Sequence, residues 1–310
     1  RARLISKGNA LKHHRPRIGL ALGSGSARGW SHIGVIRTLE EAGISPDIVC
    51  GTSIGALVGA VYAAGELPRF ESWVRELKWK GVVSLLDPRM GGGLIEGSKL
   101  IEFFRQRFDD KGIKKLPKTF SCVATDLVSG RETWLREGPV IDAVRASIAL
   151  PGLFTPAVHE GRLLVDGGLV NPVPVSLCRA LGADIVIAVD LNWDLVGRRN
   201  RVSGNDQKEE AGEDNGSLVD TILARFRPGK RRKQDGEPDM PSMLDVLGTS
   251  LNIMQVRITQ SRLAGEPADA MIRPRLSDIA AMDFHRAPAA IAEGEKAAQH
   301  ALPMIQELLA

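Results

Sequence analysis

The spacing of apolar residues over the first 65 positions predicts two strand–helix units in succession. The runs RIGLALG (17–23) and DIVCGT (47–52) are short and apolar, as buried strands are. After the first run, apolar residues recur at helical spacing over 33–39, and Gly43 supplies a C-terminal stop. After the second, a helix of small residues is expected over 53–64. This βαβα start predicts a parallel sheet with right-handed crossovers.

Strand and helix signals continue along the chain. The run DIVIAVDL (184–191) is uninterrupted, which is typical of a strand covered on both faces. The runs 119–127 and 131–135 are joined by VSG and predict a hairpin. Further expectations are an irregular helical section over 66–118 with a glycine turn at 90–97, helices over 138–150, 175–181, 242–265 and from 285 onward, and strands at 162–165 and 268–274.

These elements fit one large α/β domain over 17–310, with a mainly parallel central sheet between helices in three layers. Residues 1–16 form a basic N-terminal tail. From about 194 to 241 the chain is polar, charged and glycine-rich, so it cannot bury enough surface to order itself. We therefore expect a mobile insertion there. Within it, 216–236 has an apolar helical face and a basic end, which fits either docking on anionic lipid or a solvated loop.

Composition excludes several classes of protein. The apolar fraction of 43% and the charged fraction of 25% are those of a globular protein. A net charge of +4 gives no overall basic field, so we expect no nucleic-acid partner. The chain has no run of eighteen apolar residues, and its basic start lacks the apolar stretch of a secretory signal. A cytoplasmic protein is expected, with peripheral contact with the inner membrane as an option.

The three cysteines lie in apolar surroundings, which favours buried, reduced thiols. Neither a CxxC pair nor a Cys/His cluster is present, so no metal site is expected.

The segment GTSIG raises the first question of chemistry, because one hydroxyl, Ser53, stands between Gly51 and Gly55. A strand precedes it and a helix of small residues follows. In that context G-x-S-x-G marks a turn so tight that the serine Oγ is exposed at the edge of the sheet. The flanking glycines fit this turn because a Cβ at either position would meet backbone. An ordinary helix N-cap is the alternative.

The loop GSGSARG (23–29) ends the first strand and opens a helix. Its backbone N–H groups can bind an anion, and they should lie beside Ser53 because neighbouring parallel strands end at one edge of the sheet. The loop lacks the G-K-[ST] of a phosphate-binding P-loop. A dinucleotide site would need a carboxylate at the end of the second strand, where the chain has Cys50-Gly51-Thr52.

A serine nucleophile needs a base, and the histidines are poor candidates. Of the six, only His285 and His300 follow every candidate acid, and neither stands at a strand end. His32 opens a helix and fits a packing or capping role, while His159 lies in a probable turn. Asp166 in LLVDGGLVNP is the better candidate, since it follows a strand and precedes glycines. An aspartate that only bonds its own turn is equally consistent with this pattern.

A resemblance decides between these alternatives. LALGSGSARGWSHIGVIRTLEEAGI, GTSIG and VDGGLVNPVPV, in this order, resemble the bacterial patatin-like phospholipases, relatives of neuropathy target esterase. The likeness is strong over about 17–195 and includes DFHRAPAAIAEGEKAA near the end. It implies a Ser–Asp dyad, a phospholipid or lysophospholipid substrate, and no cofactor or metal.

Carried over residue by residue, the resemblance assigns Ser53 as nucleophile and Asp166 as base. It also implies an oxyanion hole formed by the amides near Gly25, Ser26 and Arg28. Gly167 and Gly168 are then turn glycines that let backbone approach the carboxylate, and the Arg28 side chain braces the loop or aids phosphate recognition. The chain departs from the family pattern at Ser24 and Ser26, where glycines are common, which puts the loop conformation in question. A non-catalytic patatin-like module that binds lipid or protein is the alternative function.

Overall fold

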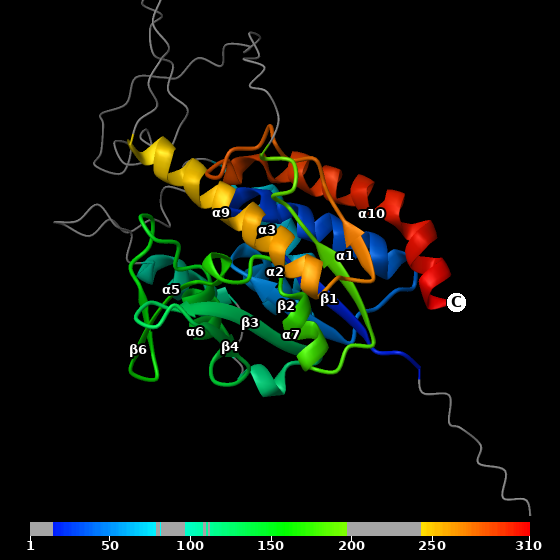
Figure 1. The fold of residues 1–310 in the computed structure, drawn as a ribbon, viewed down its shortest axis with the longest axis horizontal. Helices are drawn as coiled ribbons and strands as arrows, with labels where there is room; N and C mark the ends of the chain where they lie inside the picture. The colour runs from blue at the N-terminus through cyan, green and yellow to red at the C-terminus, as the bar shows by residue number, and fades with distance from the viewer. Residues whose placement is uncertain (1–14, 79–80, 82–96, 108–109, 111, 197–242) are drawn as a thin grey trace, which may run out of the picture.

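The computed structural model describes residues 15–78, 81, 97–107, 110, 112–196 and 243–310. These residues form one mixed sheet with helices on both faces (Figure 1). The N-terminal tail, the glycine turn at 90–96 and nearly all of the predicted insertion, including 216–236, lie outside the described residues.

The sheet has eight strands, and its parallel part has the order β3-β2-β1-β7-β8. Strands β4 and β6 pair antiparallel with β3, and β5 pairs antiparallel with β6. The predicted mainly parallel sheet is confirmed, and the first strand lies beside the strand that leads to Ser53. The strands are β1 (Ile18–Leu22), β2 (Ile48–Thr52), β3 (Thr119–Asp126), β4 (Glu132–Leu135), β5 (Ala157–His159), β6 (Arg162–Asp166), β7 (Ile185–Val189) and β8 (Ala270–Ile272).

Helices cover both faces of this sheet, which is why β1 is buried at every position. The side chains of Ile18, Leu20 and Leu22 join the larger core, beneath α1, α2 and α10, while Ala21 faces the smaller core beneath α7. The described α-helices are α1 (Ser31–Glu41), α2 (Ile54–Ala63), α3 (Leu67–Arg75), α5 (Ser98–Arg107), α6 (Val140–Ser147), α7 (Val175–Ala180), α9 (Met243–Gly265) and α10 (Ala287–Leu309).

Two glycines bring α1 and α10 into backbone contact. A Cβ on Gly34 would lie 2.1 Å from the carbonyl oxygen of Ile291, and a Cβ on Gly294 would lie 2.0 Å from that of Ser31. Neither position can carry a side chain without moving the helices apart. The C-terminal helix is thus fixed against the first helix of the fold.

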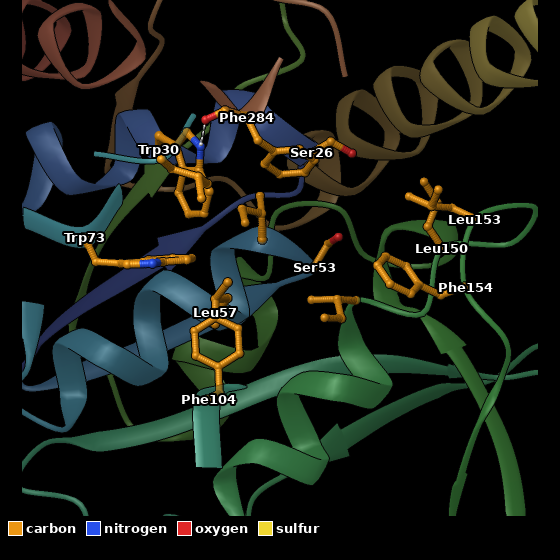
Figure 2. Close-up of a pocket in the computed structure, with 13 residues that line it drawn as sticks. Ser26, Trp30, Ser53, Leu57, Trp73, Phe104, Leu150, Leu153, Phe154 and Phe284 are labelled. Carbon is orange, nitrogen blue, oxygen red and sulfur yellow. Dashed lines mark hydrogen bonds between the residues drawn. The ribbon is translucent and has the colours of Figure 1, made fainter. Parts of the chain in front are cut away.

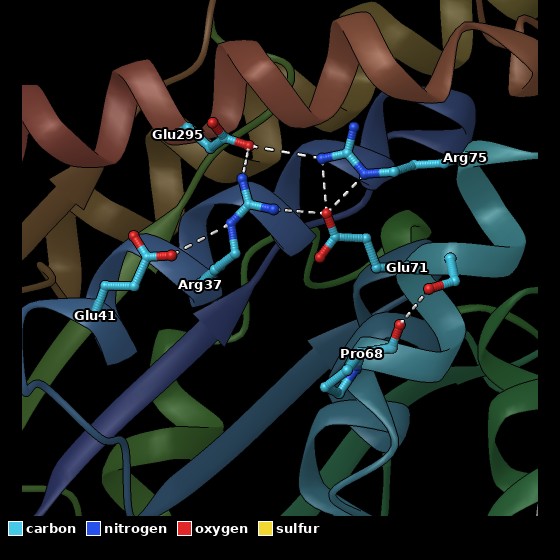
Figure 3. A network of polar contacts seen from close by, with 7 residues as sticks. Arg37, Glu41, Pro68, Glu71, Arg75 and Glu295 are labelled. Carbon is cyan, nitrogen blue, oxygen red and sulfur yellow. Dashed lines mark hydrogen bonds and ion pairs between the residues drawn. The ribbon is translucent and has the colours of Figure 1, made fainter.

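A network of ion pairs joins α3 to the same two helices (Figure 3). Arg37 of α1 pairs with Glu71 of α3 at 2.7 Å and with Glu295 of α10. Arg75 also pairs with Glu71 at 2.7 Å. Glu71 is only 14% exposed, so these contacts are less screened by water than ordinary surface pairs. These ion pairs hold α3 in place, and Trp73 of this helix lines a cavity beside Ser53.

One element differs from the sequence prediction. The segment AVHEGR was expected to be a turn, but Ala157–His159 forms strand β5, which pairs with β6. The turn is confined to Glu160 and Gly161, whose φ angles are 49° and 74°. Two successive positive φ angles match the twist of a tight two-residue hairpin. The short edge strand has an exposed Val158 and therefore lacks the apolar run that identified the other strands.

Candidate active site

Ser53 occupies a strained turn between β2 and α2. Its φ of 57° and ψ of −125° are a conformation that residues with a side chain rarely adopt. A Cβ on Gly51 would lie 2.3 Å from the carbonyl oxygen of Gly55, and a Cβ on Gly55 would lie 2.2 Å from that of Leu22. Only glycine fits at these two positions, so the turn can bring β2, β1 and α2 into direct contact at the serine.

Asp166 ends β6 and faces Ser53. The Ser53 hydroxyl donates to Asp166 Oδ2 at 2.5 Å, and the other carboxylate oxygen accepts from the Gly168 amide at 2.7 Å. Asp166 therefore bonds its own turn and Ser53 at the same time, so the two readings of the sequence are compatible. A Cβ on Gly167 would lie 2.2 Å from the carbonyl oxygen of Val123, which lets this turn pack directly against β3.

Burial changes the acid–base properties of Asp166. The residue is 1% exposed, and this desolvation raises the pKa of its carboxyl to about 6, while the hydrogen bonds from Ser53 and Gly168 act to lower it. The carboxylate is still mainly ionised at pH 7. It is a stronger base than an exposed aspartate, which suits it to accept a proton from a hydroxyl.

Two buried hydroxyls hold this pair in place, and sequence reasoning missed both. Ser147, at the end of α6, accepts from the Ser53 amide at 2.9 Å and donates to the carbonyl oxygen of Val123 at 2.6 Å. Thr125 of β3 donates to the carbonyl oxygen of Asp166 at 2.8 Å. In the sequence, each of these residues is a single hydroxyl within an apolar element. The spacing of apolar residues does not show which distant residue such a hydroxyl bonds, and Ser147 lies 94 residues from Ser53.

The backbone amides of the loop 23–29 differ in whether they are already hydrogen-bonded. The amides of Gly25 and Ser26 form no hydrogen bond with any residue that the structure describes. The Arg28 amide, by contrast, donates to the carbonyl oxygen of Gly25 at 3.2 Å. Ser26 has a φ of 50°, so the serine occupies a conformation that glycine adopts more readily. Of the three amides that the sequence suggested as oxyanion donors, two remain available and the third is already bonded.

Two buried side chains, Arg28 and His32, hydrogen-bond to the backbone of this loop. Arg28 Nε donates to the carbonyl oxygen of Gly25 at 3.1 Å, and burial lowers the pKa of its guanidinium to about 10, against the opposing charge of Asp194. His32 Nε2 lies 2.8 Å from the carbonyl oxygen of Gly23. Burial lowers the pKa of His32 to about 4, so the neutral ring donates this bond at pH 7. Within the described ranges, no histidine is hydrogen-bonded to Ser53 or Asp166.

Two cavities meet at Ser53. One, of about 100 Å³, is walled by aliphatic and aromatic side chains from α2, α3, α5 and the segment after α6 (Figure 2). The labelled side chains converge on the space beside Ser53: Trp30, Leu57, Trp73, Phe104, Leu150, Leu153, Phe154 and Phe284. The other cavity, of about 340 Å³, is lined mostly by apolar side chains, among them Leu247, Leu251 and Met254 of α9, and also by Arg28, Asp166 and polar residues of α9. A substrate with a group on each side of its reactive atom could occupy the two spaces.

Helix α9 closes one side of the larger cavity, a role the sequence did not predict. Gln255 Oε1 accepts from Ser24 Oγ and from Asn192 Nδ2, both at 3.1 Å. Asn192 Nδ2 also reaches the carbonyl oxygen of Ser24 at 3.2 Å. This buried amide pair ties α9 and the end of β7 to the glycine loop.

The cysteines Cys50, Cys122 and Cys178 are free and buried, as predicted. His285 and His300 are exposed. In the part of the chain that the structure describes, no three His, Cys, Asp or Glu side chains are grouped as metal ligands would be. No helix in the described ranges is both long enough and apolar enough to cross a bilayer.

Comparison with known proteins decides the family. A family profile described as patatin-like phospholipase matches residues 20–179. The chain belongs to the patatin-like phospholipase family. An uncharacterized NTE family protein of Mycobacterium tuberculosis, Rv1063c, is 34% identical to this chain, over 93% of this chain and 91% of the relative. The resemblance seen in the three motifs is confirmed.

Two further similarities are more limited. Lysophospholipase nte1 of Aspergillus fumigatus is 36% identical to this chain over 182 residues, which is 56% of this chain and 12% of that protein. The crystal structure of VipD from Legionella pneumophila superposes with a TM-score of 0.47 and 14% identity, over 94% of this chain and 67% of that chain.

Proposed function

We propose that this protein hydrolyses carboxylic esters of phospholipids or lysophospholipids through an acyl-serine intermediate. The observation that supports this most strongly is the 2.5 Å contact between the Ser53 hydroxyl and the buried carboxylate of Asp166. Family membership supports lipid ester hydrolysis as the reaction class. The name of the fungal relative, a lysophospholipase, favours a substrate with one acyl chain.

In the first half-reaction, Asp166 takes the proton of Ser53 as Oγ attacks the ester carbonyl carbon. The negative charge that develops on the carbonyl oxygen would be stabilised by the amides of Gly25 and Ser26. One such donor is typically worth about 3 kcal/mol in the transition state. As the tetrahedral species collapses, the ester C–O bond breaks and Asp166 returns the proton to the departing alcohol. The acyl group remains on Ser53.

In the second half-reaction, water enters the position that the alcohol has left. Asp166 removes a proton from this water as its oxygen attacks the acyl carbon. The bond to Ser53 Oγ then breaks, and Asp166 returns the proton to Ser53. The products are a free fatty acid and the regenerated enzyme, so one carboxylate serves as base and then acid in each half.

The two cavities suggest how a lipid would bind. The apolar cavity is suited to the acyl chain, because burying apolar surface there is favourable. The larger cavity has room for the rest of the lipid; most of its lining is apolar, and the buried Arg28 in its wall offers a charge-assisted contact to a phosphate. This arrangement puts the ester bond at Ser53, between the two.

A fluorophosphonate probe tests the proposal directly. We expect the purified protein to be labelled at Ser53, identified by mass spectrometry of the modified peptide, and to release fatty acid from lysophosphatidylcholine or phosphatidylcholine vesicles. The Ser53→Ala variant should do neither. A folded protein that is not labelled and releases no fatty acid would instead favour the alternative, a patatin-like module that binds lipid or protein without catalysis.

A further inference from the structure

A second apolar cavity continues from the first. It has a volume of about 50 Å³ and is walled by α2, α5 and α6. Three side chains line both cavities: Leu57, Phe104 and Ile148. They therefore form the boundary between the space beside Ser53 and the space behind it.

Both cavities follow one face of α2. Ser53 and Leu57 border the first, and Leu57, Val61 and Ala64 border the second. Residues spaced by three and four positions share a helix face, so these side chains form one continuous stripe. At a rise of 1.5 Å per residue, the stripe extends about 16 Å from Ser53 to Ala64, of which about 10 Å lies beyond Leu57.

Phe104 is the largest side chain at this boundary and is held firmly. It is 5% exposed, and its ring centroid lies 6.1 Å from that of Trp73 and 6.3 Å from that of Phe70. Figure 2 shows the Leu57 side chain between the Phe104 ring and Ser53. A chain that enters from Ser53 along α2 meets this pair of side chains before it can reach the second cavity.

We propose that Phe104, together with Leu57 and Ile148, limits the length of the acyl chain that the enzyme accepts, and that the second cavity is the extension a longer chain would occupy once the ring is removed. This inference rests on the proposed esterase function. An extended carbon chain advances about 1.2 Å per bond, as an extended polypeptide backbone does. The length beyond Leu57 would span about eight carbon–carbon bonds, but the cavity volume of about 50 Å³ limits the extension to a few further methylene groups.

The test is a chain-length profile of kcat/KM on p-nitrophenyl esters from butanoate to hexadecanoate. For Phe104→Ala, the optimum should move to a chain several carbons longer, and the ratio of kcat/KM for the longest to the shortest esters should rise at least tenfold. Burial of one methylene group changes an equilibrium about fourfold, so a few newly buried groups suffice for this change. Phe104→Leu, which disturbs the core less, should give a smaller shift in the same direction.

A variant in the second cavity provides the matched control. Ala64 is partly exposed and borders only the far cavity of the two. Ala64→Leu alone should leave the profile of the wild-type enzyme unchanged, because its chains do not reach that cavity. Combined with Phe104→Ala, it should reduce the gain for long esters.

Different results would refute the proposed esterase function and the proposed role of Phe104. If all variants and the wild type lack esterase activity and fluorophosphonate labelling, the proposed function is wrong. If the wild type is active and Phe104→Ala and Phe104→Leu are labelled at normal rates with an unchanged chain-length profile, the role of Phe104 is refuted while the function stands. A chain-length profile changed by Ala64→Leu alone would also refute the proposal, because it would show that chains already reach the second cavity in the wild-type enzyme.

Discussion

Ser53 and Asp166 lie 113 positions apart in the sequence, yet their side chains are joined by a 2.5 Å hydrogen bond. Ser53 directly follows β2 and Asp166 ends β6, and these two strands lie on either side of β3 in the sheet. The bond therefore depends on the register of three strands rather than on a local turn. A small error in that register would separate the two side chains, so the sheet as a whole determines the geometry of the pair.

Removal of either side chain should stop turnover without unfolding the protein. Ser53→Ala should have no measurable esterase activity, and Asp166→Asn should lower kcat/KM by about 10²- to 10⁴-fold, the usual contribution of a general base. Steady-state kinetics and circular dichroism check this together. Ser72→Ala, an exposed serine on α3, is the control and should behave as wild type. Normal turnover by either folded site variant would falsify the assignment.

The activity should depend on the ionisation of Asp166. Its pKa is raised to about 6 by burial, and only the carboxylate can accept the Ser53 proton. We expect kcat/KM to be constant above about pH 7 and to fall about tenfold per pH unit below about pH 6. Rates on a short soluble ester, with intrinsic fluorescence to verify folding at each pH, provide the measurement. A flat profile between pH 5 and pH 7 would exclude Asp166 as the base.

The raised pKa of Asp166 also makes the stability of the fold depend on pH. Low pH should stabilise the folded protein although it lowers the activity. The carboxyl pKa is about 6 in the folded protein against an ordinary value of 3.8, so the folded state binds the proton more tightly. The resulting stabilisation is complete below about pH 3.8 and is lost as the pH rises through about 6. Two pKa units correspond to about 3 kcal/mol.

Asp166→Asn removes this titration. The free energy of unfolding of the variant, relative to wild type, should therefore be about 3 kcal/mol larger at pH 8 than at pH 4, because only the wild type loses stability as the pH rises. Urea denaturation at the two pH values measures it. A difference that is equal at both pH values would show that burial of the charge carries no such cost.

Ser147 should act as a positioning residue for the nucleophile. Ser147→Ala leaves the Ser53 amide and the Val123 carbonyl oxygen without their buried partner, which costs about 1–3 kcal/mol of stability. It also frees the strained turn, so we expect kcat to fall about tenfold while KM changes little. Ser147→Thr keeps the hydroxyl and should restore part of kcat. An unchanged kcat in folded Ser147→Ala would assign Ser147 a purely structural role.

Features that depend on one short, contiguous segment could be predicted from the sequence. The elbow at Ser53 is one, because the strand, the two glycines and the helix are contiguous; the turn at Asp166 is another. The partners Ser147, Thr125 and Gln255 could not be predicted in this way. Their contacts join elements that are distant in the chain, and a lone polar residue in an apolar segment does not identify its partner. The engagement of the Arg28 amide likewise depends on the exact path of the loop.

The β1–β7 pairing has a practical consequence for dissecting this protein. The family match ends at residue 179, but every residue of β1 is paired with β7, which begins at Ile185. A fragment cut at the end of the match would leave the strand that leads into the glycine loop as a bare apolar edge, the kind of surface that drives aggregation. A fragment expressed to study the chemistry should therefore extend through the last helix, and the failure of a shorter one should be attributed to its incomplete sheet.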